Sequence, residues 1–276
     1  MTDRDPRLTL ARPDVADARL EGVLPARRYA RSTPLRIGLA STGLHRAPDQ
    51  ASERMDELVY GENFDVLGED GAFLWGQARR DGYVGYVSRD AFWPTGSGLP
   101  THRVSALRSF AFTEPSIKAR AAGPFSLNAL VRVLAEEGSF SASDDGLWFW
   151  TGHLAPIGLF ERDAASVAER FLGTPYLWGG RTSVGLDCSG LIQQSLYACG
   201  LACPRDTDLQ AGLGHSVERA NLVRGDLVCW RGHIGMMLDG SRLIHANASH
   251  MCVAIEPLDE AIARIGPPTA LRRLRG

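Results

Sequence analysis

The pattern of apolar and polar positions divides the chain into regions of different texture. Residues 1–30 show no clear period, and we expect them to form an extension that wraps a neighbouring domain. From about Leu35, short apolar runs are separated by turn residues and glycine. These runs span 64–67, 73–78 and 83–87. Strands of this length, with Asp-Gly turns between them, predict a small β-barrel over residues 31–98.

Residues 104–158 repeat this order of features. An apolar run at 129–134 precedes an acidic turn that ends in glycine, an aromatic strand follows, and an Asp-Asp-Gly turn leads into the aromatic run 147–150. The repeat is weak but has about the size of an SH3-like barrel, so we predict two such barrels in succession. A single larger and irregular β domain is the alternative that this pattern leaves open.

The pattern changes again in the last part of the chain. Residues 163–172 carry apolar side chains at helical spacing, with Asp163 as the predicted N-cap. A second helix is predicted over 191–199, and Gly200 is expected to end it. Three strand-like runs follow, at 226–230, 233–238 and 242–246. Helices followed by antiparallel strands predict an α+β domain over residues 162–276.

Composition and charge narrow the classes of function. The chain has 276 residues, of which 44% are hydrophobic, and its formal net charge is −2. This balance gives no electrostatic footprint for nucleic acid or for a membrane surface, so neither is an expected partner. No run of 18 apolar residues is present, and the mixed charges at 3–7 do not fit a signal peptide. The odd number of cysteines, five, then indicates reduced thiols and a cytoplasmic location.

Cys188 is the candidate nucleophile. It follows a glycine-rich stretch and stands directly before the helix at 191–199, which places it at or just inside a helix N-terminus. The helix dipole and the unpaired N–H groups there stabilise a thiolate, so we expect Cys188 to be largely thiolate near neutral pH. The same N–H groups can bind the oxyanion that forms when sulfur attacks a carbonyl. Cys199, on the apolar face of the helix, is expected to be a structural thiol.

Two histidines are candidate bases. His233 begins one strand-like run, and His245 lies on the next run. In an antiparallel pair such residues are neighbours, so His245 can orient His233 through the ring nitrogen that does not face the sulfur. His233 would take the proton of Cys188 and return it to the departing amine. A metal-binding pair and two core histidines are the alternatives that these residues leave open.

Five motifs occur in an order that resembles the NlpC-type cell-wall peptidases. They are Pro175-Tyr176-x-Trp178-Gly179-Gly180, Asp187-Cys188-Ser189-Gly190, Gly225-Asp226-Leu227, Gly232-His233-Ile234-Gly235 and Ile244-His245-Ala246. The resemblance covers about residues 162–276 and implies a papain-like cysteine peptidase fold that cleaves peptidoglycan stem peptides. It implies that Cys188, His233 and His245 are catalytic, and that the Tyr176 hydroxyl faces the sulfur and assists the oxyanion. It implies no metal ion and no organic cofactor.

Two SH3-like barrels ahead of such a domain resemble the γ-D-glutamyl-L-diamino acid endopeptidases that recycle muropeptides. In that group the first barrel closes one end of the cleft, so only peptides with a free N-terminal L-alanine are accepted. The resemblance implies that Asp187 and Ser189 bind the alanine ammonium. It also implies that Trp178 walls the side-chain pocket and that Tyr83 helps to close the site. One barrel carboxylate should join them, and the sequence does not choose among Glu53, Glu57 and Glu62.

The expected substrate is L-Ala-γ-D-Glu-diaminopimelate, cleaved between γ-D-Glu and the diamino acid. A secreted autolysin acting on intact cell wall, a wall-binding protein with an inactive peptidase domain, and an acyltransferase on the same fold are the alternatives. The preferred diamino acid and the oligomeric state are left undetermined. Outside the site, we expect Arg205-Asp206-Thr207 to fix a loop and the basic run at 272–275 to form a solvated tail.

Overall fold

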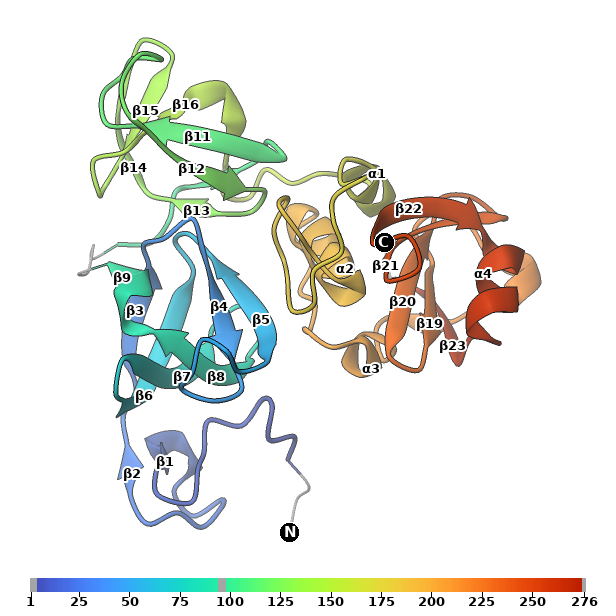
Figure 1. Ribbon diagram of the computed structural model, residues 1–276, viewed down its shortest axis with the longest axis horizontal. Helices are drawn as coiled ribbons and strands as arrows, with labels where there is room; N and C mark the ends of the chain where they lie inside the picture. Colours follow the sequence, from blue (N-terminus) through green and yellow to red (C-terminus); the bar gives the residue numbers. More distant parts are fainter. Residues whose placement is uncertain (1–3, 94–97, 275–276) are drawn as a thin grey trace. The chain divides into compact units, whose positions relative to one another are not determined.

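The chain folds into two compact units, Met1–Ile157 and Gly158–Gly276 (Figure 1). The computed structural model describes residues 4–93 and 98–274. None of the helices in these ranges has the length and hydropathy that a membrane span requires. Each unit has its own sheets and its own apolar core.

The first barrel is a seven-stranded sheet in the order β5-β4-β8-β7-β6-β3-β9. Its strands are β3 (Thr33–Ile37), β4 (Ser41–His45), β5 (Arg54–Val59), β6 (Asn63–Asp70), β7 (Phe73–Ala78), β8 (Val84–Ser88) and β9 (Phe92–Trp93). Apolar side chains that alternate along these strands fill the interior, among them Ile37, Leu44, Phe64 and Val87. The three strands predicted between residues 64 and 87 are present as β6, β7 and β8.

Residues 4–30 pack on this barrel. They contain β1 (Ala16–Asp17) and β2 (Tyr29–Ala30), which pair in parallel. Leu10 and Val15 join Trp75 in a small apolar cluster. The guanidinium of Arg12 lies 4.4 Å from the centroid of the Trp75 ring. The extension therefore covers an apolar surface of the first barrel.

The second barrel consists of two sheets, with the orders β13-β10-β17 and β12-β11-β16-β15-β14. Its strands are β10 (His102–Val104), β11 (Arg108–Phe112), β12 (Ala121–Ser126), β13 (Leu130–Val131), β14 (Val133–Glu137), β15 (Phe140–Ser143), β16 (Trp148–Trp150) and β17 (Leu154–Pro156). Tyr60 of the first barrel packs into its core, with its ring centroid 5.0 Å from that of Phe125. The two barrels thus share part of a core, and the predicted limits at 31–98 and 104–158 stay predictions.

The second unit is an α+β domain, which confirms the predicted fold class. Its six-stranded sheet has the order β18-β23-β19-β20-β21-β22. The strands are β18 (His215–Ser216), β19 (Leu227–Trp230), β20 (His233–Met237), β21 (Arg242–Asn247), β22 (Cys252–Pro257) and β23 (Ala270–Arg273). The helices are α1 (Ala164–Glu169), α2 (Cys188–Ala198), α3 (Thr207–Gln210) and α4 (Leu258–Ile265).

Helix α2 is the central element of this unit. Every one of its residues is buried, and it packs against β20 and β21. Burial on all sides explains why its sequence carries no charged residue. Gly200 has a φ of +74°, the left-handed conformation that a glycine adopts after a helix end, as expected from the sequence. The helix holds its first residue, Cys188, beside the sheet.

The C-terminal residues form elements that the sequence pattern did not predict. The expectation of a solvated tail is wrong for the described part of the basic run, because Arg272 and Arg273 lie in β23, which pairs with β18 on one side and with β19 on the other. Arg273 also donates hydrogen bonds of 2.7 and 2.8 Å to the Asp226 carboxylate. A four-residue strand with two arginines has no apolar alternation, so only its tertiary pairing reveals it. Arg275 lies outside the described residues.

Candidate active site

Cys188 is the first residue of helix α2. Asp187 is the N-cap of this helix, and its carboxylate accepts a hydrogen bond of 2.8 Å from the backbone N–H of Gly190. The predicted position of Cys188 at a helix N-terminus is therefore confirmed. The sulfur accepts hydrogen bonds from the backbone N–H groups of Ser189 and Ile234. Because Ile234 follows His233 on β20, this strand reaches the sulfur.

The Cys188 thiol is protonated in this environment. Burial, with a smaller contribution from the Asp187 carboxylate, raises the pKa of the thiol to about 12. The two N–H groups and the guanidinium of Arg205 act in the opposite direction but do not offset burial. The expectation that Cys188 is largely thiolate near neutral pH is therefore wrong. A base has to remove the thiol proton when the sulfur attacks.

His233 and His245 lie side by side on β20 and β21, as predicted. Nε2 of His233 and Nδ1 of His245 are 2.8 Å apart. Gly235 lies close to the same strand, because a Cβ at position 235 would lie 2.7 Å from Leu243 Cδ1 and 3.2 Å from the Cβ of His245. Burial is the main cause that lowers the pKa of each histidine to about 4. Both rings are thus neutral at pH 7, and His233 is able to accept a proton.

Glu256 extends this pair of rings and was missed by the sequence analysis. Its Oε1 lies 2.6 Å from Nε2 of His245, and Arg264 donates hydrogen bonds to both carboxylate oxygens. Glu256 lies on β22, which no run in the predicted set covered. The signal that would have found it is a single carboxylate within the otherwise apolar run 252–257.

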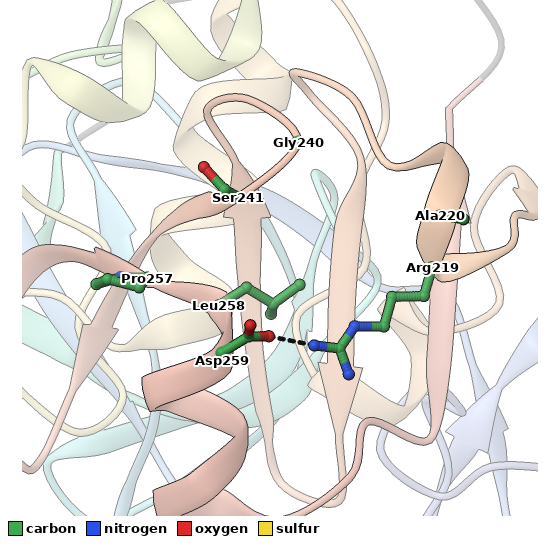
Figure 2. A pocket seen from close by; sticks show the side chains of 7 residues that line it. All are labelled: Arg219, Ala220, Gly240, Ser241, Pro257, Leu258 and Asp259. Atoms are coloured by element: carbon green, nitrogen blue, oxygen red, sulfur yellow. Dashed lines mark hydrogen bonds and ion pairs between the residues drawn. The ribbon is translucent and has the colours of Figure 1, made fainter.

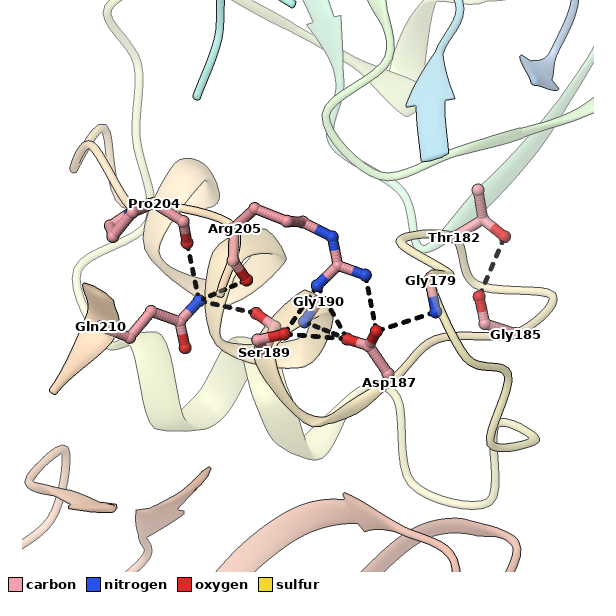
Figure 3. A network of polar contacts seen from close by, with 9 residues as sticks. All are labelled: Gly179, Thr182, Gly185, Asp187, Ser189, Gly190, Pro204, Arg205 and Gln210. Carbon is pink, nitrogen blue, oxygen red and sulfur yellow. Dashed lines mark hydrogen bonds and ion pairs between the residues drawn. The ribbon is translucent and has the colours of Figure 1, made fainter. Parts of the chain in front are cut away.

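A second buried network surrounds the N-cap of α2 (Figure 3). Arg205, 1% exposed, donates to both oxygens of Asp187, at 3.0 and 2.6 Å, and to Ser189 Oγ at 2.6 Å. The backbone N–H of Gly179 and that of Gly190 also donate to Asp187. Arg205 therefore holds the loop to the helix start, as expected.

The polar atoms of Asp187 and Ser189 are engaged by this network. Asp187 accepts five hydrogen bonds, of which Ser189 Oγ donates one. A substrate ammonium would have to displace one of these donors. The geometry favours a structural role for both residues, and their predicted contact with an ammonium stays a prediction.

Two segments of the chain match known protein families. Residues 173–264 match the NlpC/P60 family, and residues 44–92 match the bacterial dipeptidyl-peptidase Sh3 domain. The chain carries an NlpC/P60 domain. This domain is of the cysteine-peptidase type, and the resemblance seen in the motifs is confirmed. Cys188, His233, His245 and Glu256 all lie within the matched residues.

Several proteins are similar to this chain over most of its length. A Bacillus subtilis (strain 168) protein named gamma-D-glutamyl-L-lysine dipeptidyl-peptidase is 26% identical over 226 residues, or 75% of this chain and 76% of that protein. Dipeptidyl-peptidase 6 of Lysinibacillus sphaericus is 22% identical over 240 residues, which are 79% of this chain and 89% of that protein. A solved NlpC/P60 family protein from Bacillus cereus ATCC 10987 superposes with a TM-score of 0.77 at 19% identity, covering 87% of this chain and 99% of that chain. That likeness shows a common fold.

Two aromatic residues of the NlpC/P60 domain were predicted to act at the site. Burial raises the pKa of Tyr176, and the next cause is the negative charge of an ionised Cys188, so the phenol lies within electrostatic reach of the sulfur. Trp178 is 59% exposed. Assistance to the oxyanion by Tyr176 and a pocket wall formed by Trp178 stay predictions.

The barrel residues predicted to bind substrate have different surroundings. Tyr83 is 5% exposed and packs in the core of the first barrel. Glu62 is buried, pairs with Arg80 at 2.9 Å and accepts from a backbone N–H. Glu57 is buried and accepts a 2.8 Å hydrogen bond from Ser41. Glu53 forms a surface ion pair with Arg46. The choice among the three glutamates, and the role of Tyr83, stay predictions.

Metal binding was an alternative reading of the histidines. Ligand atoms of His245, His250 and Glu256 lie within 4.8 Å of one another. However, Arg264 donates to both oxygens of Glu256 and places a positive charge next to any cation there. His250 Nδ1 is 2.9 Å from the side-chain oxygen of Asn247. This donor set fits an ion pair with a histidine rather than a metal centre.

A separate cavity lies near the start of α4 (Figure 2). Its volume is about 520 Å³, and it is lined by Arg219, Ala220, Gly240, Ser241, Pro257, Leu258 and Asp259. Arg219 and Asp259 form an ion pair across it. Cys188, His233 and His245 are not among the residues that line it, so this cavity is separate from the candidate active site.

Proposed function

We propose that this protein is a cysteine endopeptidase that cleaves the bond between γ-D-Glu and the diamino acid of peptidoglycan stem peptides with a free N-terminal L-Ala. The proposal is carried by the position of Cys188 at the start of α2 and by the contact between His233 and His245, within an NlpC/P60 domain. The Sh3 domain at 44–92 supports the narrower substrate class. Relatives from Bacillus subtilis and Bacillus cereus are named gamma-D-glutamyl-L-lysine dipeptidyl-peptidase.

The proposed reaction proceeds through an acyl-enzyme. His233 accepts the thiol proton as the Cys188 sulfur forms a bond to the carbonyl carbon of the γ-glutamyl amide. The oxyanion is stabilised by N–H groups at the start of α2. The C–N bond then breaks, and His233 gives its proton to the departing amine of the diamino acid. Water, deprotonated by His233, hydrolyses the thioester and releases L-Ala-γ-D-Glu and the free thiol.

A free α-amine at the substrate's first residue is the proposed specificity determinant. To release a dipeptide, the enzyme has to bind the substrate's N-terminus two residues before the bond that it cleaves. A buried ammonium needs carboxylate partners, and a substrate that lacks the ammonium leaves those partners unpaired. A barrel carboxylate, with Glu53, Glu57 and Glu62 as the candidates, is proposed for this role. The substrate would be a released muropeptide, and a cytoplasmic place in muropeptide recycling is part of the proposal.

A second candidate is an endopeptidase that acts on intact cell wall. It is favoured by an Escherichia coli (strain K12) protein named murein DD-endopeptidase MepS/murein LD-carboxypeptidase, which is 40% identical over 83 residues. Those residues are 28% of this chain and 44% of that protein. Relatives that match three quarters or more of both chains carry more weight than so short a match.

The test compares matched peptides. We expect the purified protein to cleave L-Ala-γ-D-Glu-diaminopimelate, or its L-lysine counterpart, into L-Ala-γ-D-Glu and the free diamino acid, as measured by mass spectrometry. N-acetylation of the L-alanine should reduce kcat/KM by roughly a hundredfold, which is the size of effect expected when a buried polar site loses its partner. Cys188→Ala should remove all turnover. Equal rates on the free and acetylated peptides, or release from intact sacculi, would favour the second candidate.

A further inference from the structure

Four side chains, those of His233, His245, Glu256 and Arg264, form a continuous polar line that begins next to Ile234, whose backbone N–H reaches the sulfur of Cys188. Nε2 of His233 lies 2.8 Å from Nδ1 of His245, and Nε2 of His245 lies 2.6 Å from Oε1 of Glu256. Arg264 donates to both oxygens of that carboxylate. His245 is fully buried and Glu256 is 6% exposed. The inner part of the line is therefore shielded from water.

The register of the sheet places this line on one face. His245 on β21 stands opposite Ala254 on β22, and Glu256 stands opposite Leu243. Residues two apart on a strand share a face, so the side chains of His245 and Glu256 are diagonal neighbours. Helix α4 begins directly after β22 and returns Arg264 to the carboxylate.

These contacts determine which ring nitrogens carry protons. Although burial opposes it, the hydrogen bonds from Arg264 keep the pKa of Glu256 below its usual range, so Glu256 is an ionised acceptor. Nε2 of His245 must then be the protonated nitrogen. A neutral imidazole carries one ring proton, so Nδ1 of His245 accepts and Nε2–H of His233 donates. This leaves Nδ1 of His233 as the unprotonated nitrogen available to the thiol.

We propose that Glu256 is a positioning residue of the active site, which sets the tautomers of both histidines and is the counter-charge for the imidazolium that forms on His233. The proposal rests on the proposed peptidase function and adds a residue to it. When Nδ1 of His233 takes the thiol proton, the ring becomes a cation that still donates Nε2–H to His245. No second proton moves, and Glu256 stays ionised.

The charged groups around the rings act in opposite directions. In the part of the chain that the structure describes, Glu256 raises the pKa of both histidines, whereas burial and Arg264 lower it. A charge on His245 also lowers the pKa of His233. His250 acts in the same direction as Arg264 on His245. Glu256 is thus the group that counteracts the cost of placing a cation at this buried position.

Two variants separate the charge of Glu256 from its hydrogen bond. Glu256→Gln keeps an oxygen that accepts from Nε2–H of His245 but removes the counter-charge. We expect kcat to fall about tenfold with KM unchanged, because the residue does not touch substrate. The acid limb of the kcat profile should move to lower pH, since a group that raises the pKa of His233 is lost. Glu256→Ala also removes the acceptor, and we expect a fall of about a hundredfold. Glu260, an exposed acid on α4, provides the matched control, and Glu260→Gln should leave kcat, KM and the acid limb of the kcat profile unchanged.

The tautomers are tested directly by long-range ¹H–¹⁵N spectra of the full-length protein labelled at histidine nitrogens. In the wild type, Nδ1 of His233 and Nδ1 of His245 should be unprotonated, and Nε2 of each should be protonated. Glu256→Gln should retain this pattern and lower the pKa of His233. Glu256→Ala should lose it. If Glu256→Ala does not fold, the wild-type spectrum and Glu256→Gln suffice.

A His233 ring protonated at Nδ1 in the wild type would overturn the proposal. So would a Glu256→Gln variant with wild-type kcat and an unchanged pKa of His233. The spectra require no turnover, so they remain decisive if the proposed substrate is wrong. Activity that survives Cys188→Ala would instead refute the peptidase mechanism and leave the tautomer assignment standing.

Discussion

The buried ion pair between Arg205 and Asp187 is predicted to hold helix α2 in place. Their side chains are 1% and 7% exposed, and the Nη2–Oδ2 distance is 2.6 Å. Arg205→Met removes the positive partner and leaves a buried carboxylate. Losing one member of a buried pair costs about 3–5 kcal/mol. Asp187 would retain its contacts with Gly179, Ser189 and Gly190, so we expect the lower end of this range, about 3 kcal/mol.

Hydrogen exchange of the α2 amides measures this loss in the full-length protein. A cost of about 3 kcal/mol corresponds to exchange that is roughly a hundredfold faster, since each factor of ten is about 1.4 kcal/mol. Arg242→Met is the matched control, because Arg242 also pairs with an aspartate, Asp239, but at the surface. It should leave α2 exchange unchanged. The double variant Asp187→Asn with Arg205→Met should recover part of the loss. Exchange in Arg205→Met that equals the Arg242→Met control would refute the reasoning.

Three further outcomes are expected. Iodoacetamide should modify Cys188 slowly at pH 7, and the rate should still rise above pH 9, because the pKa of the thiol is about 12. The rate is measured by mass spectrometry of the labelled peptide, and a rate that levels off below pH 7 would contradict this. Gly235→Ala should lower kcat/KM about tenfold, because the added Cβ would lie 2.7 Å from Leu243 Cδ1 and 3.2 Å from the Cβ of His245, so both side chains have to shift; an unchanged kcat/KM would contradict this. The free energy of unfolding should fall as pH drops from about 6.5 to about 4, because His233 and His245 bind protons in the unfolded chain at a pH where they are still neutral in the folded protein. A free energy of unfolding that does not change with pH in urea titrations would refute the two lowered pKa values.

Local sequence was sufficient for the elements that carry the chemistry. An N-cap aspartate, a cysteine and a glycine before an apolar run place the thiol at a helix start, because capping depends on neighbours within a turn. The two histidines on successive short strands were expected to meet, because antiparallel strands joined by a short turn have little freedom of register. Barrel strands with Asp-Gly turns were recognisable for the same reason.

Only the tertiary structure decided the electrostatics of the site. The pKa of Cys188 depends mainly on burial, which outweighs the helix N-terminus that the local sequence suggested. Arg205 reaches Asp187 from eighteen residues away, and Glu256 reaches His245 only through the pairing of β21 with β22. Strand β23 is recognised only by its pairing with β18 and β19. Sequence patterns report spacing along one element, whereas desolvation and charge pairing depend on which distant segments exclude water from the same place.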